Sequence, residues 1–174
     1  MKKLITLFCF VLVTSLTTDL MAQNFPDLDK SPADIASYPR NNPIVKVIYG
    51  RPLLKGRDLN QIIPEGKVWR TGANESTQIT FFKDVNFGGT DVKAGTYTLF
   101  SIWGADGFTI ILNSNLNTWG TYGYDPAKDI LRASTTISNL DKPLEAFSMT
   151  FTEENDVITL HLGWDTKTAA VQIK

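Results

Sequence analysis

Three features of the 174-residue sequence predict an all-β fold, most simply a single antiparallel β-sandwich. Short runs rich in Val, Ile, Thr and aromatic residues alternate apolar with polar positions, which is the period of a half-buried strand. Clusters of Gly, Asn and Asp separate these runs at close spacing. No long stretch repeats its apolar residues with the period of a helix. A jelly-roll-like sandwich and a closed barrel are the alternatives that the same pattern permits.

The amino terminus has the three parts of a secretory signal peptide. Lys2 and Lys3 precede an apolar run, Leu4–Leu16, and Ala22 supplies a small residue at a cleavage position. The apolar run is too short to span a bilayer, so we expect residues 1–22 to be removed by cleavage near Ala22. The mature chain would then have no transmembrane segment and would be exported to a bacterial periplasm or the cell exterior.

Between the predicted signal peptide and the first strand, residues 23–43 are rich in Pro, Asp, Ser and Asn. This composition predicts an irregular lead-in with a short helical turn near Pro32–Ser37. The β-sandwich domain is expected to span residues 44–174. Within it, one short helix is predicted near Leu59–Ile63, because Pro64 follows and cannot continue it.

Eight or nine short runs are expected to form strands, and within each run alternate residues, such as Ile79 and Phe81, would share one face. The clearest strands are Ile44–Tyr49, Thr77–Lys83, Thr96–Trp103, Phe108–Leu112, Ile130–Ile137, Leu144–Thr152, Ile158–Trp164 and Thr168–Ile173. Turns are predicted at Asn86–Gly89, Gly104–Gly107, Glu153–Asp156 and Asp165–Lys167. The second of these turns would join two strands into a hairpin.

The numbers of cysteine, histidine and charged residues argue against several classes of function. The one cysteine, Cys9, lies in the predicted signal peptide, so the mature chain would have neither disulfides nor a catalytic thiol. With His161 as the one histidine, the usual ligands of a transition-metal site are lacking, and we expect no metal and no cofactor. The formal net charge of −1 gives no general attraction for nucleic acid. Neither a Gly-x-Ser-x-Gly motif nor a phosphate-binding loop is present.

One stretch, Lys67–Thr77 with the sequence KVWRTGANEST, combines residue types that an ordinary connection lacks. Trp69 offers a large apolar surface, and Arg70 offers a planar set of donors suited to carboxylates and phosphates. Asn74 and Glu75 add an amide and a carboxylate, and Gly72 can take a positive φ that most residues do not tolerate. The stretch either forms a ligand or catalytic site or has a structural role. In the structural role, Arg70 pairs with Glu75 and Trp69 closes one end of the core.

Three arginines, Arg51, Arg57 and Arg70, lie in this stretch or shortly before it. If the fold brings them together, their guanidinium groups would form a patch that binds a carboxylate, phosphate or sulfate. In the alternative interpretation they are solvated loop residues, or they tie loops to backbone carbonyls.

A loop rich in Gly and Asn contains Trp119, Tyr122 and Tyr124. Aromatic faces held by glycine turns can stack on sugar rings. Side chains that would supply hydrogen bonds there are Asn113, Asn115, Asn117 and Asp125. In the alternative interpretation, the three rings close one end of the sandwich.

Four segments also carry the motifs of a known family: Tyr49–Arg57, Val68–Glu75, Ala94–Phe100 and Trp119–Pro126. By these motifs the chain resembles the DUF2911 family over nearly its whole mature length, and the segment VWRTGANE is the most specific of them. The resemblance implies an exported, β-rich bacterial domain of a kind frequent in Bacteroidetes. It implies no reaction, because the family name denotes a domain of unknown function.

The sequence favours a non-catalytic binding or interaction module that holds a small polar ligand or glycan between residues 67–77 and 113–126. Two alternatives remain open. A hydrolase would use Glu75 with Asp125 or Asp129 as an acid–base pair. A structural scaffold of the cell envelope would present a broad apolar patch instead of a pocket. The sequence identifies neither the ligand nor an oligomeric state.

Overall fold

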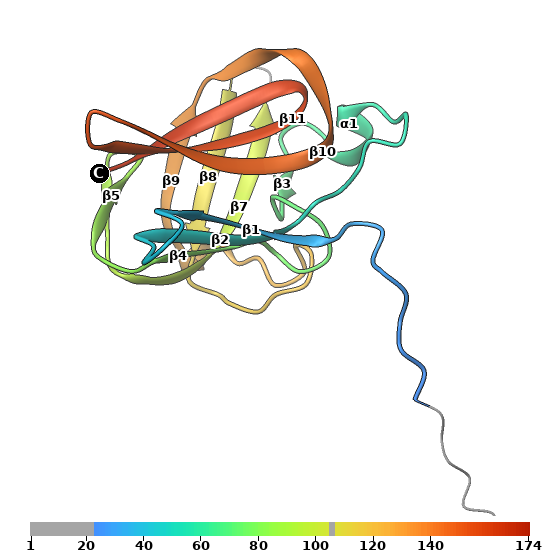
Figure 1. Ribbon diagram of the computed structural model, residues 1–174, viewed down its shortest axis with the longest axis horizontal. Helices are drawn as coiled ribbons and strands as arrows, with labels where there is room; N and C mark the ends of the chain where they lie inside the picture. The colour runs from blue at the N-terminus through green and yellow to red at the C-terminus, as the bar shows by residue number, and fades with distance from the viewer. Residues whose placement is uncertain (1–22, 105–106) are drawn as a thin grey trace, which may run out of the picture.

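The computed structural model describes residues 23–104 and 107–174, and the predicted signal peptide lies outside them. The described chain folds into two antiparallel β-sheets that pack on each other, with a short helix and a single 3-10 turn (Figure 1). The predicted all-β sandwich is confirmed, and the sheets do not close into a barrel. In this described part, no helix combines the length and the apolar character needed to cross a bilayer.

The larger sheet has seven strands. Six of them follow the order β1-β2-β4-β7-β8-β9, and the seventh, β3, pairs with the same edge of β7 as β4 but further along that strand. Its strands are β1 (Ala33–Tyr38), β2 (Val45–Gly50), β3 (Val68–Trp69), β4 (Gln78–Phe81), β7 (Gly95–Gly104), β8 (Gly107–Asn113) and β9 (Asp129–Thr135). The expected hairpin is the β7–β8 pair. The helix α1 (Leu59–Ile62) lies within one residue of its predicted position.

The smaller sheet has the order β10-β11-β5-β6, and its strands are β5 (Val85–Phe87), β6 (Thr90–Val92), β10 (Ile137–Glu154) and β11 (Val157–Ile173). The chain passes between the sheets three times, from β4 to β5, from β6 to β7 and, at Thr136, from β9 to β10. β10 and β11 form a long hairpin that lies across the larger sheet (Figure 1).

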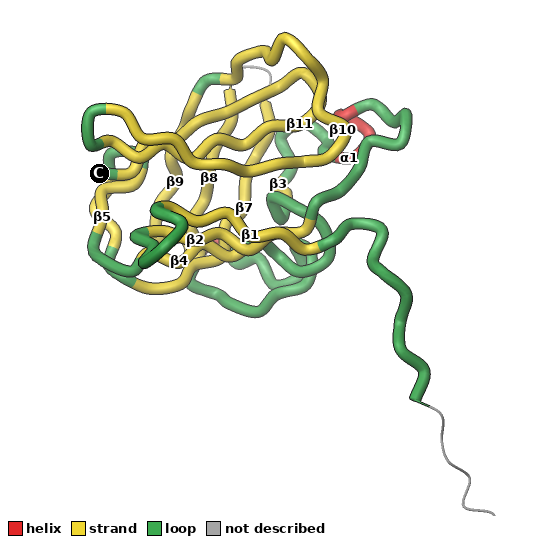
Figure 2. Tube along the Cα trace, in the orientation of Figure 1, coloured by secondary structure: helices red, strands yellow, loops and turns green. Residues whose placement is uncertain are grey.

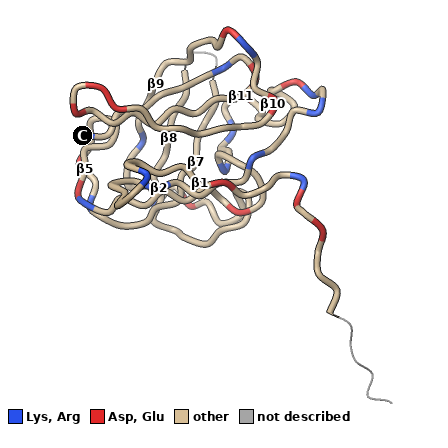
Figure 3. Tube along the Cα trace, viewed as in Figure 1, with Lys and Arg blue, Asp and Glu red and all other residues tan. Residues whose placement is uncertain are grey.

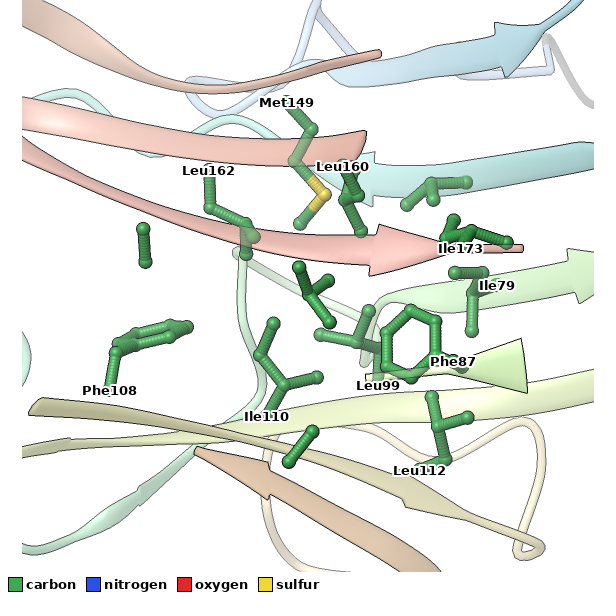
Figure 4. Packing of buried hydrophobic residues seen from close by; sticks show 14 of the residues in the cluster. Ile79, Phe87, Leu99, Phe108, Ile110, Leu112, Met149, Leu160, Leu162 and Ile173 are labelled. Carbon is green, nitrogen blue, oxygen red and sulfur yellow. The ribbon is translucent and has the colours of Figure 1, made fainter. Parts of the chain in front are cut away.

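The core lies between the two sheets and is built from the alternate residues that the strand period predicts. Ile79 and Phe81 of β4 are at most 1 % exposed. Leu99 and Ile110 from the larger sheet and Leu160 from the smaller one point into the same space (Figure 4). With no disulfide available to the described residues, this apolar packing supplies the main stabilisation of the fold.

Trp69 closes one end of this core, as the structural interpretation of its stretch proposed. Its ring stacks on Trp164 with centroids 5.8 Å apart and planes 17° apart, and it meets Phe147 edge-on at 4.9 Å. The side chain of Trp69 is 9 % exposed. It therefore belongs to the core and is not available to a ligand at the surface.

The outer face of the larger sheet is covered over one half only. Phe100 of β7 points away from the core cluster, yet it is fully buried. The loop after β8 covers it, because the Tyr124 ring packs edge-on against Phe100 with centroids 5.0 Å apart. On β1 and β2 the same face lies open, where Ile35 is 61 % exposed and Ile48 is 42 % exposed.

The segment Ala33–Tyr38 is strand β1, so the expectation of a helical turn there is wrong. It pairs with β2 in continuous register, from Ala33 opposite Gly50 to Tyr38 opposite Val45. This partner is distant in the sequence and overrides the weak local preference of the segment. The irregular lead-in is limited to residues 23–32, and its amino-terminal part runs away from the sandwich (Figure 2).

One predicted turn is wrong, and another is shorter than predicted. Asp165–Lys167 does not end a strand, because β11 runs through it from Val157 to Ile173. Asp165 has a φ of 52°, and the register with β10 shifts nearby, so the polar residues are absorbed as an irregularity in a long strand pair. In Asn86–Gly89, the turn itself is confined to the two glycines that join β5 to β6.

Candidate functional site

The Lys67–Thr77 stretch and the loop after β8 meet at the outer face of the larger sheet. Glu75 and Trp119 form an isolated antiparallel bridge. Two backbone hydrogen bonds flank it, from Ser76 N–H to Thr118 C=O at 2.9 Å and from Gly120 N–H to Asn74 C=O at 3.1 Å. We call this unit, residues 74–76 and 118–120, the ribbon. The structure therefore brings together the two segments that the sequence analysis expected to meet.

Backbone conformation in the first segment is unusual. Thr71 has a φ of 55° and Asn74 a φ of 62°, and a positive φ is rare for a β-branched residue such as threonine. Thr71 is fully buried, its hydroxyl donates to Ser101 Oγ at 2.8 Å, and its carbonyl accepts from Thr77 Oγ1 at 2.7 Å. Gly72, which could adopt a positive φ most easily, does not do so. The buried hydrogen bonds hold Thr71 in its strained conformation instead.

Gly72 lets the backbone of its segment lie close to the backbone at the end of β2. A Cβ on Gly72 would lie 3.0 Å from the Gly50 carbonyl oxygen, and a Cβ on Gly50 would lie 2.3 Å from the Ala73 carbonyl oxygen. The pairing of β2 with β4 ends at Ile48 opposite Gln78. Beyond this pair the two strands separate, and the backbone of residues 72–73 packs against the end of β2.

A groove of about 330 Å³ lies where β2 and β4 separate. Its walls come from β1, β2, the start of β4, the ribbon and the loop after β8. The lining residues are Ser31, Ala33, Ile48, Tyr49, Gly50, Ala73, Asn74, Glu75, Ser76, Gln78 and Asn117. Of the residues that the sequence analysis singled out, Asn74, Glu75 and Asn117 are in this set.

Polar side chains at the groove are ordered by one another. Gln78 Nε2 donates to Asn117 Oδ1 at 3.2 Å, which leaves the other polar atom of each amide without a hydrogen bond to described residues. Asn74 Nδ2 donates to the Ser31 carbonyl oxygen at 3.5 Å. The Ser31 N–H and then the Asn74 side chain donate to the Asp29 carboxylate, which lowers the pKa of Asp29 from its usual value.

Glu75 and Arg70 do not form an ion pair, contrary to the structural interpretation of this stretch. Arg70 Nε donates to the Gly72 carbonyl oxygen at 3.3 Å. The Glu75 side chain is exposed and makes neither an ion pair nor a hydrogen bond with any residue that the structure describes. Glu75 therefore presents an available carboxylate at the groove.

The three arginines have separate partners and do not face one common point. Arg51 pairs with Asp34 at 3.1 Å and donates to the Phe147 carbonyl oxygen at 3.0 Å, which ties β1 and β2 to β10. Arg57 donates to two backbone carbonyls of its own loop, and Arg70 binds its own segment. Basic and acidic residues are interspersed along the described chain (Figure 3). These contacts match the alternative in which arginines tie loops to backbone carbonyls.

The aromatic residues of the loop fall into two groups. Trp119 is 57 % exposed and Tyr122 is 92 % exposed. Tyr124 instead packs on the sheet and donates to Asp129 at 3.0 Å. Desolvation of Tyr124, followed by its hydrogen bond to Asp129, raises the pKa of the Tyr124 hydroxyl. The interpretation of these rings as part of the fold therefore applies to Tyr124.

The two aspartates near this loop have structural partners. Asp125 caps the 3-10 turn η1 (Pro126–Lys128) and accepts from Ala127 N–H at 2.9 Å. Asp129 accepts from Asn113, Tyr124 and Arg132. Neither aspartate lines the groove.

Sequence reasoning missed the part of the groove that β1 and β2 supply. Ser31 and Ala33 fell in the predicted irregular lead-in, and Ile48 lay in a predicted strand with no feature to mark it. A usable signal was the apolar Ile48 on the face opposite the buried Val47. Recognising it required knowing that β1 pairs beside β2, which depends on a non-local contact.

Comparison with known proteins identifies a family but no individual relative. The family described as "Protein of unknown function (DUF2911)" matches residues 31–173, which include every strand from β1 to β11. No curated protein and no solved structure matches the sequence. The family match covers most of the chain and agrees with the resemblance carried by the VWRTGANE segment. The chain therefore belongs to the DUF2911 family.

Proposed function

We propose that this protein is a non-catalytic module that binds a small polar ligand or glycan in the groove beside the ribbon. The observation that carries the proposal is the unpaired Glu75 carboxylate beside Asn74, Gln78 and Asn117 in a groove of about 330 Å³. Small-molecule sites are typically concave, with a few polar groups that set the orientation of the ligand. Because Asn74, Gln78 and Asn117 already have hydrogen-bond partners, little conformational entropy would be lost by these three side chains on binding.

The arrangement gives less support to a hydrolase. An acid–base mechanism of the glycosidase type needs two carboxyl groups about 5–10 Å apart in one site. Glu75 is the one carboxylate among the lining residues of the groove. Asp125 and Asp129, the partners considered in the sequence analysis, are engaged by η1 and by Arg132.

A second candidate is an interaction surface on the same face. Ile35 lies opposite Ile48 in the β1–β2 pair, and Phe82, directly after β4, is 51 % exposed. Exposed apolar side chains on one open face are a feature of protein contact sites. If this face binds a component of the cell envelope, a variant with Ile35→Ser and Phe82→Ser should lose that contact while still binding small ligands in the groove.

Export is part of the proposal. We infer that residues 1–22 direct secretion and that the mature chain works in the periplasm or outside the cell. Mass spectrometry of the protein from periplasmic and culture fractions should find a mature amino terminus near Gln23. A full-length chain that stays in the cytoplasm would contradict export.

Binding in the groove is tested with a mixed panel of saccharides, amino acids, amines and dicarboxylates, detected by ligand-observed NMR. We expect at least one compound to bind, and a variant with Gln78→Ala and Asn117→Ala to bind it at least tenfold more weakly. A matched control is Tyr122→Ala, since Tyr122 is exposed but does not line the groove. Absence of binding by every class, or equal binding by the groove variant, would contradict the proposal.

A further inference from the structure

The chemical class of the ligand follows from three features of the groove and its rim. The first is the relationship between Glu75 and Trp119. Residues directly opposite each other in an antiparallel pair have their Cβ atoms about 4.5–5.5 Å apart, on the same side of the pair. The exposed carboxylate, which lines the groove, and the exposed indole ring, which is not among the lining residues, are therefore neighbours.

The second feature is the sign of the charge. Glu75 is the one acidic residue among the lining residues, and none of them is lysine or arginine. A phosphate or carboxylate entering the groove would meet a negative charge, and the lining residues supply no cation to offset it, which is unfavourable. The groove is thus suited to neutral or cationic ligands.

The third feature is the mixture of donors and acceptors. Because Gln78 Nε2 gives one N–H to Asn117 Oδ1, the pair still presents an acceptor, Gln78 Oε1, and free N–H donors on Asn117 Nδ2 and Gln78 Nε2. A ligand hydroxyl both donates and accepts, so it can satisfy either kind of atom. An ammonium group only donates, so it can bond Gln78 Oε1 and Glu75 but makes no hydrogen bond with the amide N–H groups, whereas a hydroxyl can use both kinds of atom.

From these features we propose that the ligand is a neutral saccharide. One sugar ring stacks on the exposed face of Trp119, and its hydroxyls bind Glu75 and the Gln78–Asn117 amide pair. Ile48 and Ala33 offer apolar contact to the part of the saccharide that enters the groove. The groove volume lies at the small end of the range of about 300–1,000 Å³ typical of small-molecule sites, which suits one or two sugar rings. This inference rests on the proposed function, because it concerns the same groove.

The test measures binding of neutral oligosaccharides of several linkage types by isothermal titration calorimetry, with choline and cadaverine as cationic probes and succinate as an anionic one. We expect at least one oligosaccharide to bind. Trp119→Ala should weaken it at least tenfold, and Trp119→Phe, which keeps an aromatic face, should restore part of the loss. Glu75→Gln should retain most of the affinity, since an amide still bonds a hydroxyl.

Each outcome separates this inference from the proposed function. If only choline or cadaverine binds, and Glu75→Gln abolishes that binding, the groove is a ligand site but the saccharide assignment is wrong. The assignment is also wrong if succinate binds in the groove and no saccharide does, or if a saccharide binds equally to Trp119→Ala. If none of the probes binds and the mixed panel also gives no ligand, both the saccharide assignment and the proposed function fail.

Discussion

Gly50 and Ala73 pack backbone against backbone, so closely that a Cβ on Gly50 would lie 2.3 Å from the Ala73 carbonyl oxygen. The contact joins the end of β2 to the segment that leads into the ribbon. It sets the point at which β2 and β4 separate, and thereby the end of the groove. The groove is therefore a consequence of main-chain packing as well as of the side chains that line it.

The first prediction concerns this contact. Gly50→Ala should lower the free energy of unfolding by about 1–3 kcal/mol, because backbone atoms must move to admit the methyl group. Urea unfolding followed by circular dichroism measures the change. Gly104→Ala is the matched control, since its Cβ would meet only one carbonyl oxygen at an ordinary 3.5 Å. Equal effects of the two substitutions would show that the Gly50 contact is not tight.

Two tryptophans of the candidate site should differ sharply in their effect on stability. Trp69→Ala removes a buried ring stacked on Trp164 and should cost about 3–5 kcal/mol of the free energy of unfolding. Trp119→Ala removes a largely exposed ring and should change it by less than about 0.5 kcal/mol. Where Trp69→Ala fails to fold, Trp69→Phe should still show a clear loss. A large loss for Trp119→Ala would mean that this ring supports the fold instead of being free for a ligand.

The absence of an Arg70–Glu75 ion pair is testable by a double-mutant cycle. With Arg70→Ala and Glu75→Ala, we expect a coupling energy within about 0.3–0.5 kcal/mol of zero, because the two side chains share no contact. The Arg51–Asp34 pair serves as the control and should show a coupling of about 1 kcal/mol. Coupling between Arg70 and Glu75 as strong as in the control pair would show that the two side chains do pair, as the structural interpretation of residues 67–77 proposed.

Alkaline pH should weaken the fold through Tyr49 and Tyr124. Burial is the main cause that raises the pKa of each hydroxyl, so each holds its proton more tightly in the folded protein than in the unfolded chain. Their contribution to stability is complete below the unfolded pKa of about 10 and is lost as the pH rises through the folded value. Unfolding free energies measured from pH 8 to 11.5 should therefore fall above pH 10. The fall should be shallower in Tyr124→Phe, and an unchanged slope in this variant would refute its role.

Much of the fold was predictable because it depends on local patterns. The alternation of Ile79 and Phe81 placed β4 and its core face correctly, and the placement of Trp69 in the core followed as the structural alternative. Strand β1 was not predictable, because Ala33–Tyr38 becomes a strand only through pairing with β2. The continuation of β11 through Asp165 was not predictable either, since the polar residues there have the local pattern of a turn.

The candidate site was predictable only in part. The chemistry of Asn74 and Glu75 and the aromatic loop marked the two segments that meet. Their neighbours Ser31 and Ile48 were missed, because sequence spacing does not give distance in space. For the same reason the arginines could not be assigned in advance, and their contacts with backbone carbonyls emerged only in the folded chain.

The most direct test of the account is a two-dimensional ¹H–¹⁵N NMR titration of the labelled mature protein with the tightest compound from the ligand panel. The account predicts that backbone amides of Ile48, Gly50, residues 74–78 and Asn117 shift together with one dissociation constant. Amides in α1 and along the β10–β11 hairpin should stay in place and serve as the internal control. Shifts confined to those distant elements, or spread evenly over the protein, would contradict the claim that the groove beside the ribbon is the binding site.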